Sequence, residues 1–446
     1  MLSYIVCVCV YSLLASSHFT NSHQDNTFIS PDVSLEPQSG LSMSSWLMLP
    51  HLHRHLYFCM VSGHKSIRAL LSSFSYVDLT EQLPTKSSPE LAVLFHHQTC
   101  AIHILQRCVA ELSQSQNEPD TGLFEGIVWF ICLCVQQSAY RSWASHLQGA
   151  KALLSFWGRR TLHDTCGFPY YAFMMMDIYR ATTSPVANIA DDTIKQHELY
   201  LQHIDAINVD ARHTLTPVPS QILVAAVATT IRRLMPTALE ESQPNAGACT
   251  VQPLTDIINL AKTFCPRSWS ENVLQLGNPT PAPPERESEI TSPLDDWIAL
   301  SQCYQSATIL YAVLSDKSCY AQYGMNDHYD KERLETSKTL MRAIRYLFQR
   351  GKGSFERPGH YKMIIWPMVV AGVEIASVGN APEDLQFLCV SLGNLSMELG
   401  ALAMHHAAVF LKDLWEARNG NRGSNEVDKS LVDWDWIFRE TPIFLM

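Results

Sequence analysis

The tightest constraint on the fold lies between residues 140 and 160, where large apolar side chains recur at intervals of three and four residues. This spacing puts the side chains on one face of an α-helix, whereas a half-buried β-strand would alternate with a period of two. The segment is therefore predicted to be a helix with one buried face. The residues of this face are Trp143, Leu147, Ala150, Leu154 and Trp157.

Two glycines in this segment carry further predictions. Gly149 lies inside the helix, where glycine lowers helix stability by about 1 kcal/mol relative to alanine. We therefore expect another helix to approach closely at Gly149. Gly158 is expected to end the helix, with Arg159 and Arg160 beside the negative end of the helix dipole.

Most of the remaining chain shows the same helical spacing, and no segment alternates with a sustained period of two. The sequence thus predicts an all-α protein, an irregular stack of many helices joined by turns. The best-defined helices are expected at residues 89–116, 123–137, 170–179, 220–234, 254–264, 293–314, 331–349, 366–376, 382–399 and 405–418.

A proline-rich stretch at residues 272–293 is the clearest internal boundary, because it contains Pro279, Pro281, Pro283 and Pro284. Such a stretch is typical of a linker or a long surface loop. We interpret the chain as a single large helical domain whose first half is 46–271 and whose second half is 294–446. The loop would separate the two halves without dividing the fold.

Residues 1–45 are interpreted as a disordered N-terminus that is either signal-like or wrongly assigned to this chain. Residues 1–17 form an apolar run that ends in small residues, as in a signal peptide, but the run lacks the positively charged start. It is also too short for a membrane span, and no membrane association is expected. The favoured alternative is a mis-set start codon or a retained intron that has replaced the true N-terminus.

The charge balance argues against nucleic-acid binding by this chain. Its 446 residues carry 32 Lys and Arg against 43 Asp and Glu, which gives a net charge of −11. Phosphate binding needs a basic face, and the sequence offers none. Charged residues make up only 17% of the chain, below the average of about 25%, so much apolar surface must be hidden in a core or at a partner interface.

The 13 cysteines are scattered, and no Cys-x2-Cys pair occurs. The closest spacings are Cys7-x-Cys9 and Cys132-x-Cys134, and several cysteines sit inside apolar helical runs. This pattern is typical of free thiols in a reducing compartment rather than of a disulfide framework.

The helix at residues 143–154 reads Trp-x-x-His-Leu-x-Gly-Ala-x-x-Leu-Leu. It resembles the signature helix of the fungus-specific transcription-factor domain, a helical regulatory region found downstream of binuclear zinc-cluster DNA-binding motifs. Further segments resemble the same family in the same order, so that the resemblance spans roughly residues 60–446. The matching positions are Trp143, His146, Leu147, Gly149, Ala150, Tyr304, Ala307, Tyr311, Trp366, Pro367, Gly372, Glu374 and Trp415, followed by Asp433-Trp-Asp-Trp-Ile437.

The resemblance implies a nuclear regulator of transcription that acts through protein partners or a homodimer, with a small-molecule effector of unknown identity as a further option. The matching residues are expected to be structural rather than catalytic. The family's zinc cluster needs six thiolates grouped around two Cys-x2-Cys pairs, and this chain lacks that pattern. DNA binding is therefore expected only if a zinc cluster is encoded upstream, and no cofactor or metal is expected in the chain itself.

Three alternatives remain open. A clusterless homologue would act only through protein partners. If residues 1–17 were a true signal peptide, the protein would be secreted rather than nuclear.

The third alternative is a helical terpene-synthase-like enzyme, which would need carboxylates at i, i+1 and i+4 to hold magnesium. Asp191-Asp192 is followed by Lys195 and Asp295-Asp296 by Ala299, which disfavours that interpretation. Asn326-Asp327 with Asp330 and Glu335 is near the second magnesium pattern, but the glutamate is one position off. The common phosphate-loop, nucleophile-elbow and zinc-protease motifs do not occur, and we predict that the protein is not an enzyme.

Three local features have competing interpretations. His51-Leu-His-Arg-His55, with Cys59 nearby, is interpreted as part of an amphipathic helix rather than as a metal site. Met174 to Met176 are interpreted as core filler, with an adaptable ligand cavity as the lesser option. Glu374 is expected to be solvent-facing or paired with an arginine, and the lesser option is a buried group that lines a pocket.

Overall fold

The computed structural model describes residues 45–73, 89–114, 121–137, 143–157, 167–189, 192–205, 211, 214, 216–235, 252–275, 293–316, 327–351, 359–420 and 433–439. The regular structure of these residues consists of α-helices and two short 3₁₀ helices, without a strand. The all-α prediction is thus confirmed. Residues 1–44, most of the proline-rich stretch and Gly158 lie outside the described residues.

The helices of the first half are α2 (Ser45–Ser73), α3 (Pro89–Gln114), α4 (Thr121–Gln137), α5 (Trp143–Trp157), α7 (Gly167–Thr182), α8 (Thr193–His203), α9 (Ser220–Leu234), α10 (Leu254–Thr263) and α11 (Pro266–Gln275). Those of the second half are α12 (Pro293–Ser315), α14 (Asp327–Gly351), α15 (Ile365–Val378), α16 (Pro382–Leu399), α17 (Leu402–Gly420) and α18 (Trp434–Ile437). The 3₁₀ helices are η2 (Val186–Asn188) and η5 (His360–Met363).

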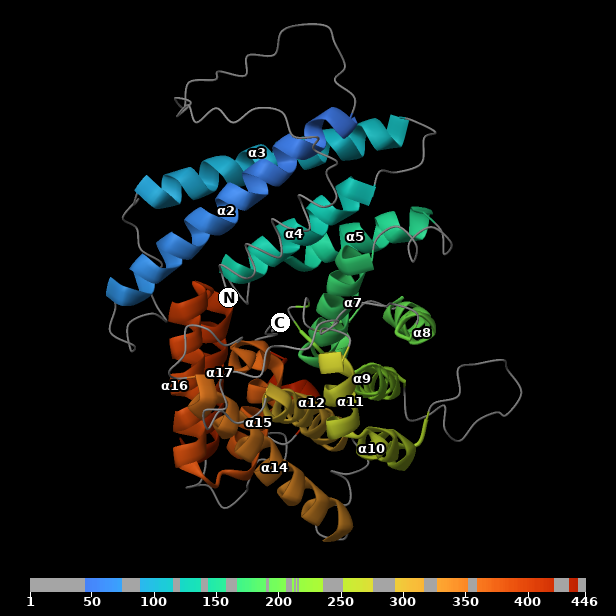
Figure 1. Cartoon of the computed structure of the whole chain (residues 1–446), viewed down its shortest axis with the longest axis vertical. Helices are drawn as coiled ribbons and strands as arrows, with labels where there is room; N and C mark the ends of the chain where they lie inside the picture. The colour runs from blue at the N-terminus through green and yellow to red at the C-terminus, as the bar shows by residue number, and fades with distance from the viewer. Residues whose placement is uncertain are drawn as a thin grey trace, which may run out of the picture.

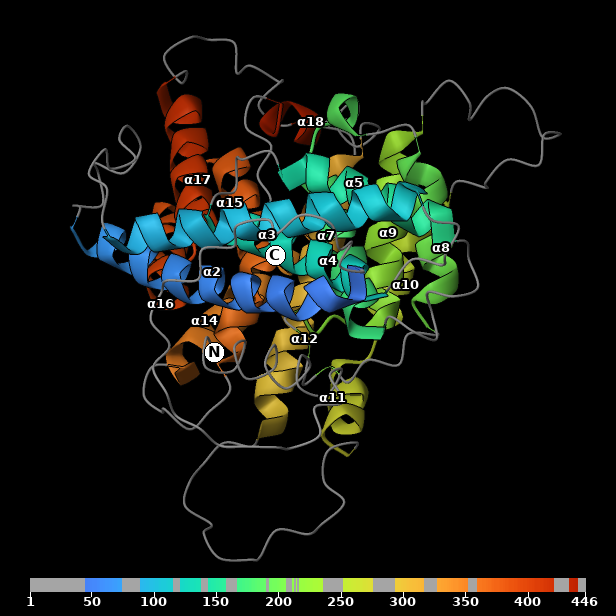
Figure 2. The same ribbon diagram turned by 90° about the horizontal axis from the view of Figure 1, so that it is seen from above.

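Helices α2 and α3 lie side by side at one end of the molecule and cover α4 (Figures 1 and 2). The amphipathic helix predicted at His51 to His55 is part of α2, and its buried residues include Leu52 and Leu56. At the other end, α9, α10, α11, α14 and α15 pack around α12. None of the helices in the described residues is both long and apolar enough to cross a bilayer.

Helix α12 is buried on nearly all sides, and its buried residues include Trp297, Tyr304 and Tyr311. Neighbouring helices contact it from several directions, so an apolar surface all round is favourable. The first turn contains Asp295 and Asp296, where carboxylates interact favourably with the helix dipole. The main hydrophobic core combines this helix with residues of both halves of the chain, among them Phe173, Leu223 and Trp366.

Most helix limits agree with the sequence prediction, and the exceptions have a tertiary cause. The limits of α9 and α16 match the predicted ranges 220–234 and 382–399, but α8 and α11 were not predicted. Helix α12 begins at Pro293, where a helix was expected, but α11 runs to Gln275, so the first residues of the 272–293 stretch are helical rather than loop. Trp269 of α11 packs against Trp297, with ring centroids 5.8 Å apart, a contact that a polar local sequence cannot reveal.

The glycines at positions 372 and 149 differ in their surroundings. A Cβ atom on Gly372 would lie 2.4 Å from Leu411 Cδ1, so this glycine permits the close contact of α15 with α17. The corresponding prediction for Gly149 was wrong, because Gly149 is exposed and a Cβ there would have no neighbour within 4 Å. The buried face of α5 is formed by Leu147, Ala150 and Leu154, and Gly149 points away from it.

Candidate functional site

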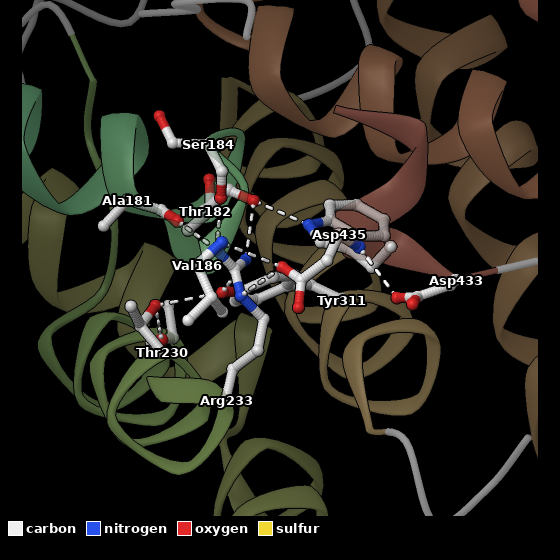
Figure 3. A network of polar contacts seen from close by, with 11 residues as sticks. Ala181, Thr182, Ser184, Val186, Thr230, Arg233, Tyr311, Asp433 and Asp435 are labelled. Atoms are coloured by element: carbon white, nitrogen blue, oxygen red, sulfur yellow. Dashed lines mark hydrogen bonds and ion pairs between the residues drawn. The ribbon is translucent and has the colours of Figure 1, made fainter. Parts of the chain in front are cut away.

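The C-terminal end of α7 is where polar side chains from four other helices converge (Figure 3). The last carbonyl groups of a helix have no partner within the helix. Here Arg233 of α9 supplies the missing donors, because its guanidinium donates to the carbonyl oxygens of Thr182 at 3.1 Å, Ala181 at 2.8 Å and Ser184 at 2.5 Å. A cation in this place also interacts favourably with the negative end of the helix dipole.

The same guanidinium is bound on its other side by α12 and α18. Arg233 donates to the hydroxyl of Tyr311 at 3.0 Å, and its Nε lies 3.5 Å from a carboxylate oxygen of Asp435. The Tyr311 hydroxyl also shares a hydrogen bond of 3.0 Å with Thr230. The side chain of Arg233 is only 1% exposed, so its charge depends on these partners rather than on water.

Two tryptophans complete the arrangement at Thr182. The indole N–H of Trp366 donates to Thr182 Oγ1 at 2.8 Å, and that of Trp434 donates to the Thr182 carbonyl at 2.7 Å. Asp433 caps α18 by accepting the backbone N–H of Asp435 at 3.0 Å. We call Thr182, Arg233, Tyr311, Trp366, Trp434 and Asp435 the α7 hub.

The aromatic family-motif residues lie next to the hub. Tyr304 donates to the carbonyl of Met363 and stacks on Trp366, with ring centroids 6.5 Å apart. Burial raises the pKa of Tyr304 well above its usual value, and the pKa of Tyr311 is raised for the same reason. Both phenols therefore stay neutral and serve as hydrogen-bond donors rather than as bases.

Most of the other motif residues that the structure describes lie within or against the packed interior, whereas Gly149 is exposed. Leu147, Ala150, Ala307, Pro367 and Gly372 are buried, Trp415 is half-buried against the core, and His146 meets the ring of Phe130 edge-on at 5.0 Å. The side chain of Trp143 lies outside the described residues. The structure thus brings Tyr304, Tyr311 and Trp366 together and places the remaining motif residues on separate helix contacts.

Glu374 takes the arginine-paired form that the sequence favoured, although it is buried rather than solvent-facing. The Nε of Arg333 donates to both of its carboxylate oxygens at 2.8 Å. Desolvation raises the pKa of Glu374, and the charge of Arg333 opposes that shift. The pair joins α14 to α15.

A second buried charge cluster joins α5 and α8 to the middle of α7. Asp177 is fully buried, and its carboxylate forms an ion pair with the ammonium group of Lys151 of α5, with Nζ and Oδ1 2.9 Å apart. Tyr200 of α8 donates to its other oxygen at 3.0 Å, and Arg180 lies 3.7 Å away. The signature helix is therefore attached to α7 through a buried lysine as well as through its apolar face.

His197 lies in this cluster without exposure to solvent. Neither ring nitrogen has a hydrogen-bond partner among the described residues. Desolvation lowers its pKa from 6.5 to about 4; Asp177 opposes the shift, whereas Lys151, Arg180 and Arg233 add to it. The imidazole is thus neutral in the folded protein at pH 7.

Because of His197, the free energy of unfolding is expected to decrease as the pH is lowered. Its pKa is lower in the folded chain, so between pH 6.5 and pH 4 the unfolded chain binds more protons, and acid favours unfolding. The full loss, reached below about pH 4, is about 3 kcal/mol. His197→Phe removes this titration and should flatten the dependence measured by urea unfolding at pH 7 and pH 5. His103→Gln, at an exposed position, is the control, and equal slopes for wild type and His197→Phe would contradict the assignment.

Sequence reasoning did not identify the charged residues of either cluster. Arg233, Asp177 and Lys151 are all buried and form these networks. A signal was present for two of them, since Asp177 interrupts an apolar run and Lys151 falls four residues after Leu147 on the buried face of its helix. A charge in such a place predicts burial with a partner, but the partner lies on another helix.

The groups weighed for metal or nucleophilic chemistry are arranged differently. Among the described residues, no group of three or more His, Cys, Asp or Glu side chains is placed to hold a metal ion. His55 instead shares a hydrogen bond of 2.8 Å with His97, and Asp296 binds Arg350 and Tyr346. Met174, Met175 and Met176 are fully buried in the main core. Burial raises the pKa of the Cys59 thiol to about 12, which suppresses thiolate formation.

Comparison with known proteins gives one result. The family model of the fungal specific transcription factor domain matches residues 27–445. This range includes nearly the whole chain, and with it both buried clusters and all of the motif residues. No curated protein and no solved structure gives a significant match.

Proposed function

The chain belongs to the fungal specific transcription factor domain family, and on this premise we propose that it is a helical regulatory domain that acts in the nucleus through protein contacts. Membership points to transcription regulation and away from catalysis. The family match over residues 27–445 is the observation that carries the proposal.

The placement of the motif residues supports a structural role for the motifs. Tyr311, Trp366 and Trp434 lie fully inside the α7 hub, where their polar atoms bind other parts of the same chain. Groups that are satisfied and buried in this way hold helices together and are not available to a substrate or to DNA. Regulation is therefore assigned to the surface of the domain.

The charge of the chain supports an action through proteins rather than through direct reading of DNA. A net charge of −11 opposes phosphate binding. Partners on the surface, including a second copy of the chain, would bring the domain to a promoter, or a zinc cluster encoded upstream would do so. No specific observation favours the terpene-synthase-like alternative.

A tethering experiment tests the proposal. The chain is fused to a heterologous DNA-binding domain in fungal cells that carry a reporter with matching operator sites. We expect the fusion to change reporter output several-fold in either direction, and a reporter without the operator sites is the control. An unchanged output would contradict a regulatory role.

Two further measurements separate the alternatives. The purified chain should show no sequence-specific DNA shift near 150 mM salt, and a specific shift would overturn the assignment to protein contacts. A fluorescent fusion expressed from the native locus should lie in the nucleus. Recovery of the protein only from the medium would support the secreted alternative instead.

A further inference from the structure

A groove of about 420 Å³ opens between the C-terminal end of α14, η5 and the outer face of α16. Helices α14 and α16 are labelled in Figure 1, where they lie apart from α7. Residues three and four positions apart on α16 form one side of the groove, since they share a helix face. The groove is lined by Phe348, Gly351, Tyr361, Glu383, Gln386, Phe387, Val390, Ser391, Asn394, Leu395 and Glu398.

Three aromatic rings form the apolar wall of the groove. The ring of Phe348 lies 5.2 Å from that of Tyr361 and 5.8 Å from that of Phe387. Tyr361 is held in place because its hydroxyl donates to the carboxylate of Glu398 at 2.9 Å. Arg345 lies 4.3 Å over Phe387 and restrains that ring as well. The wall is therefore formed before any ligand arrives, which lowers the cost of binding.

The charged residues of the lining are acidic, and two cations lie beside the aromatic wall, Arg345 at Phe387 and Lys362 at Tyr361. Two glutamates and no lysine, arginine or histidine contribute to its lining. Glu398 is already paired with Lys362 and Tyr361. Glu383, in the first turn of α16, is exposed and has no ion-pair partner among the described residues. The groove therefore combines an aromatic wall with one free carboxylate.

The size of the groove indicates a small molecule rather than a protein. Ligand pockets typically measure about 300–1,000 Å³, and the volume here falls in that range. A stable protein interface uses about 20–30 residues on each side, far more than line this groove. We propose that it binds an amphipathic organic cation, with the apolar body against Phe348, Phe387 and Tyr361 and the positive nitrogen beside Glu383. The inference concerns binding alone and does not depend on the proposed role in transcription.

Two probes of matched shape and opposite charge test this inference. Biphenyl-4-ylmethylammonium and biphenyl-4-carboxylate are titrated separately into the full chain by calorimetry at low salt. We expect the ammonium to bind about fivefold more tightly than the carboxylate, because only the ammonium complements Glu383. Equal affinities, or no binding of either probe at millimolar concentration, would overturn the proposal.

Two variants locate the site. Glu383→Gln should lower the affinity for the ammonium about threefold and leave the carboxylate unaffected, while Glu335→Gln, at an exposed glutamate outside the groove, should change neither. Val390 is 49% exposed, so Val390→Arg should fold normally, fill the groove with a positive side chain and abolish binding of the ammonium. Unchanged affinity for the ammonium in either groove variant would refute this assignment.

Discussion

Replacing Arg233 with alanine is expected to lower the free energy of unfolding by about 4 kcal/mol, measured by urea unfolding followed through tryptophan fluorescence. The change leaves the carbonyls of Ala181 and Ser184 without the donor that Arg233 supplies, and the carbonyl of Thr182 keeps only the indole N–H of Trp434. It also removes the guanidinium that lies 3.5 Å from the carboxylate of Asp435. Each buried polar group that loses its partner costs about 1–3 kcal/mol, so a large effect follows even if water enters the space.

Two variants keep the test informative if Arg233→Ala does not fold. Arg233→Lys keeps the charge but cannot serve several acceptors in a fork, so we expect it to lose most of the same free energy. Trp434→Phe removes the indole donor to Thr182 and part of a buried ring that packs against Tyr311 and Phe438, at an expected cost of about 2 kcal/mol. Arg342→Ala, at an exposed arginine of α14, is the matched control. An effect of Arg233→Ala no larger than that of the control would show that the α7 hub contributes little to stability.

Replacing Asp177 with asparagine is expected to cost about 3–5 kcal/mol. The carboxylate is the partner of Lys151 at 2.9 Å, and the lysine side chain is only 3% exposed. The substitution keeps the shape of the side chain but leaves the charges of Lys151 and Arg180 in a buried place without their counter-ion. Thermal unfolding should therefore begin at a distinctly lower temperature than in the wild type.

A double-mutant cycle isolates this pair. Adding Lys151→Met to Asp177→Asn removes the stranded cation and should restore about 1–3 kcal/mol. Asp205→Asn, at an exposed carboxylate, should stay close to the wild type. If the loss in the double variant equals the sum of the losses in the two single variants, Lys151 and Asp177 do not stabilise each other, and the assigned ion pair is contradicted.

The two clusters explain why family-motif positions are spread along the chain. Thr182 collects donors from α9, α15 and α18, and Trp434 reaches it across 252 positions of sequence. Asp177 connects the signature helix α5 to α7 and α8. Tyr311, Trp366 and Trp434 are thus parts of the contacts that fix α7, whereas Gly372 and Glu374 lie where α15 meets α17 and α14.

The positions of most helices could be predicted from the sequence, because helical periodicity depends only on residues close together in the chain. The spacing of three and four residues indicated α5, α9, α12 and α16. Helices with weak periodicity were missed, as α8 and α11 show. Their stability comes from contacts such as Trp269 with Trp297, which no local window contains.

The sequence by itself determined the all-helical class, most helix limits and the family of this protein, since each follows from residues close together in the chain or from motifs in order. Only the tertiary structure decided which charges are buried and what they bind. Arg233 sits in a helix whose local pattern is apolar, yet its partners come from α7, α12 and α18. A buried charge is stable only where distant segments place its counter-ions, so its role becomes visible when the helices are packed together.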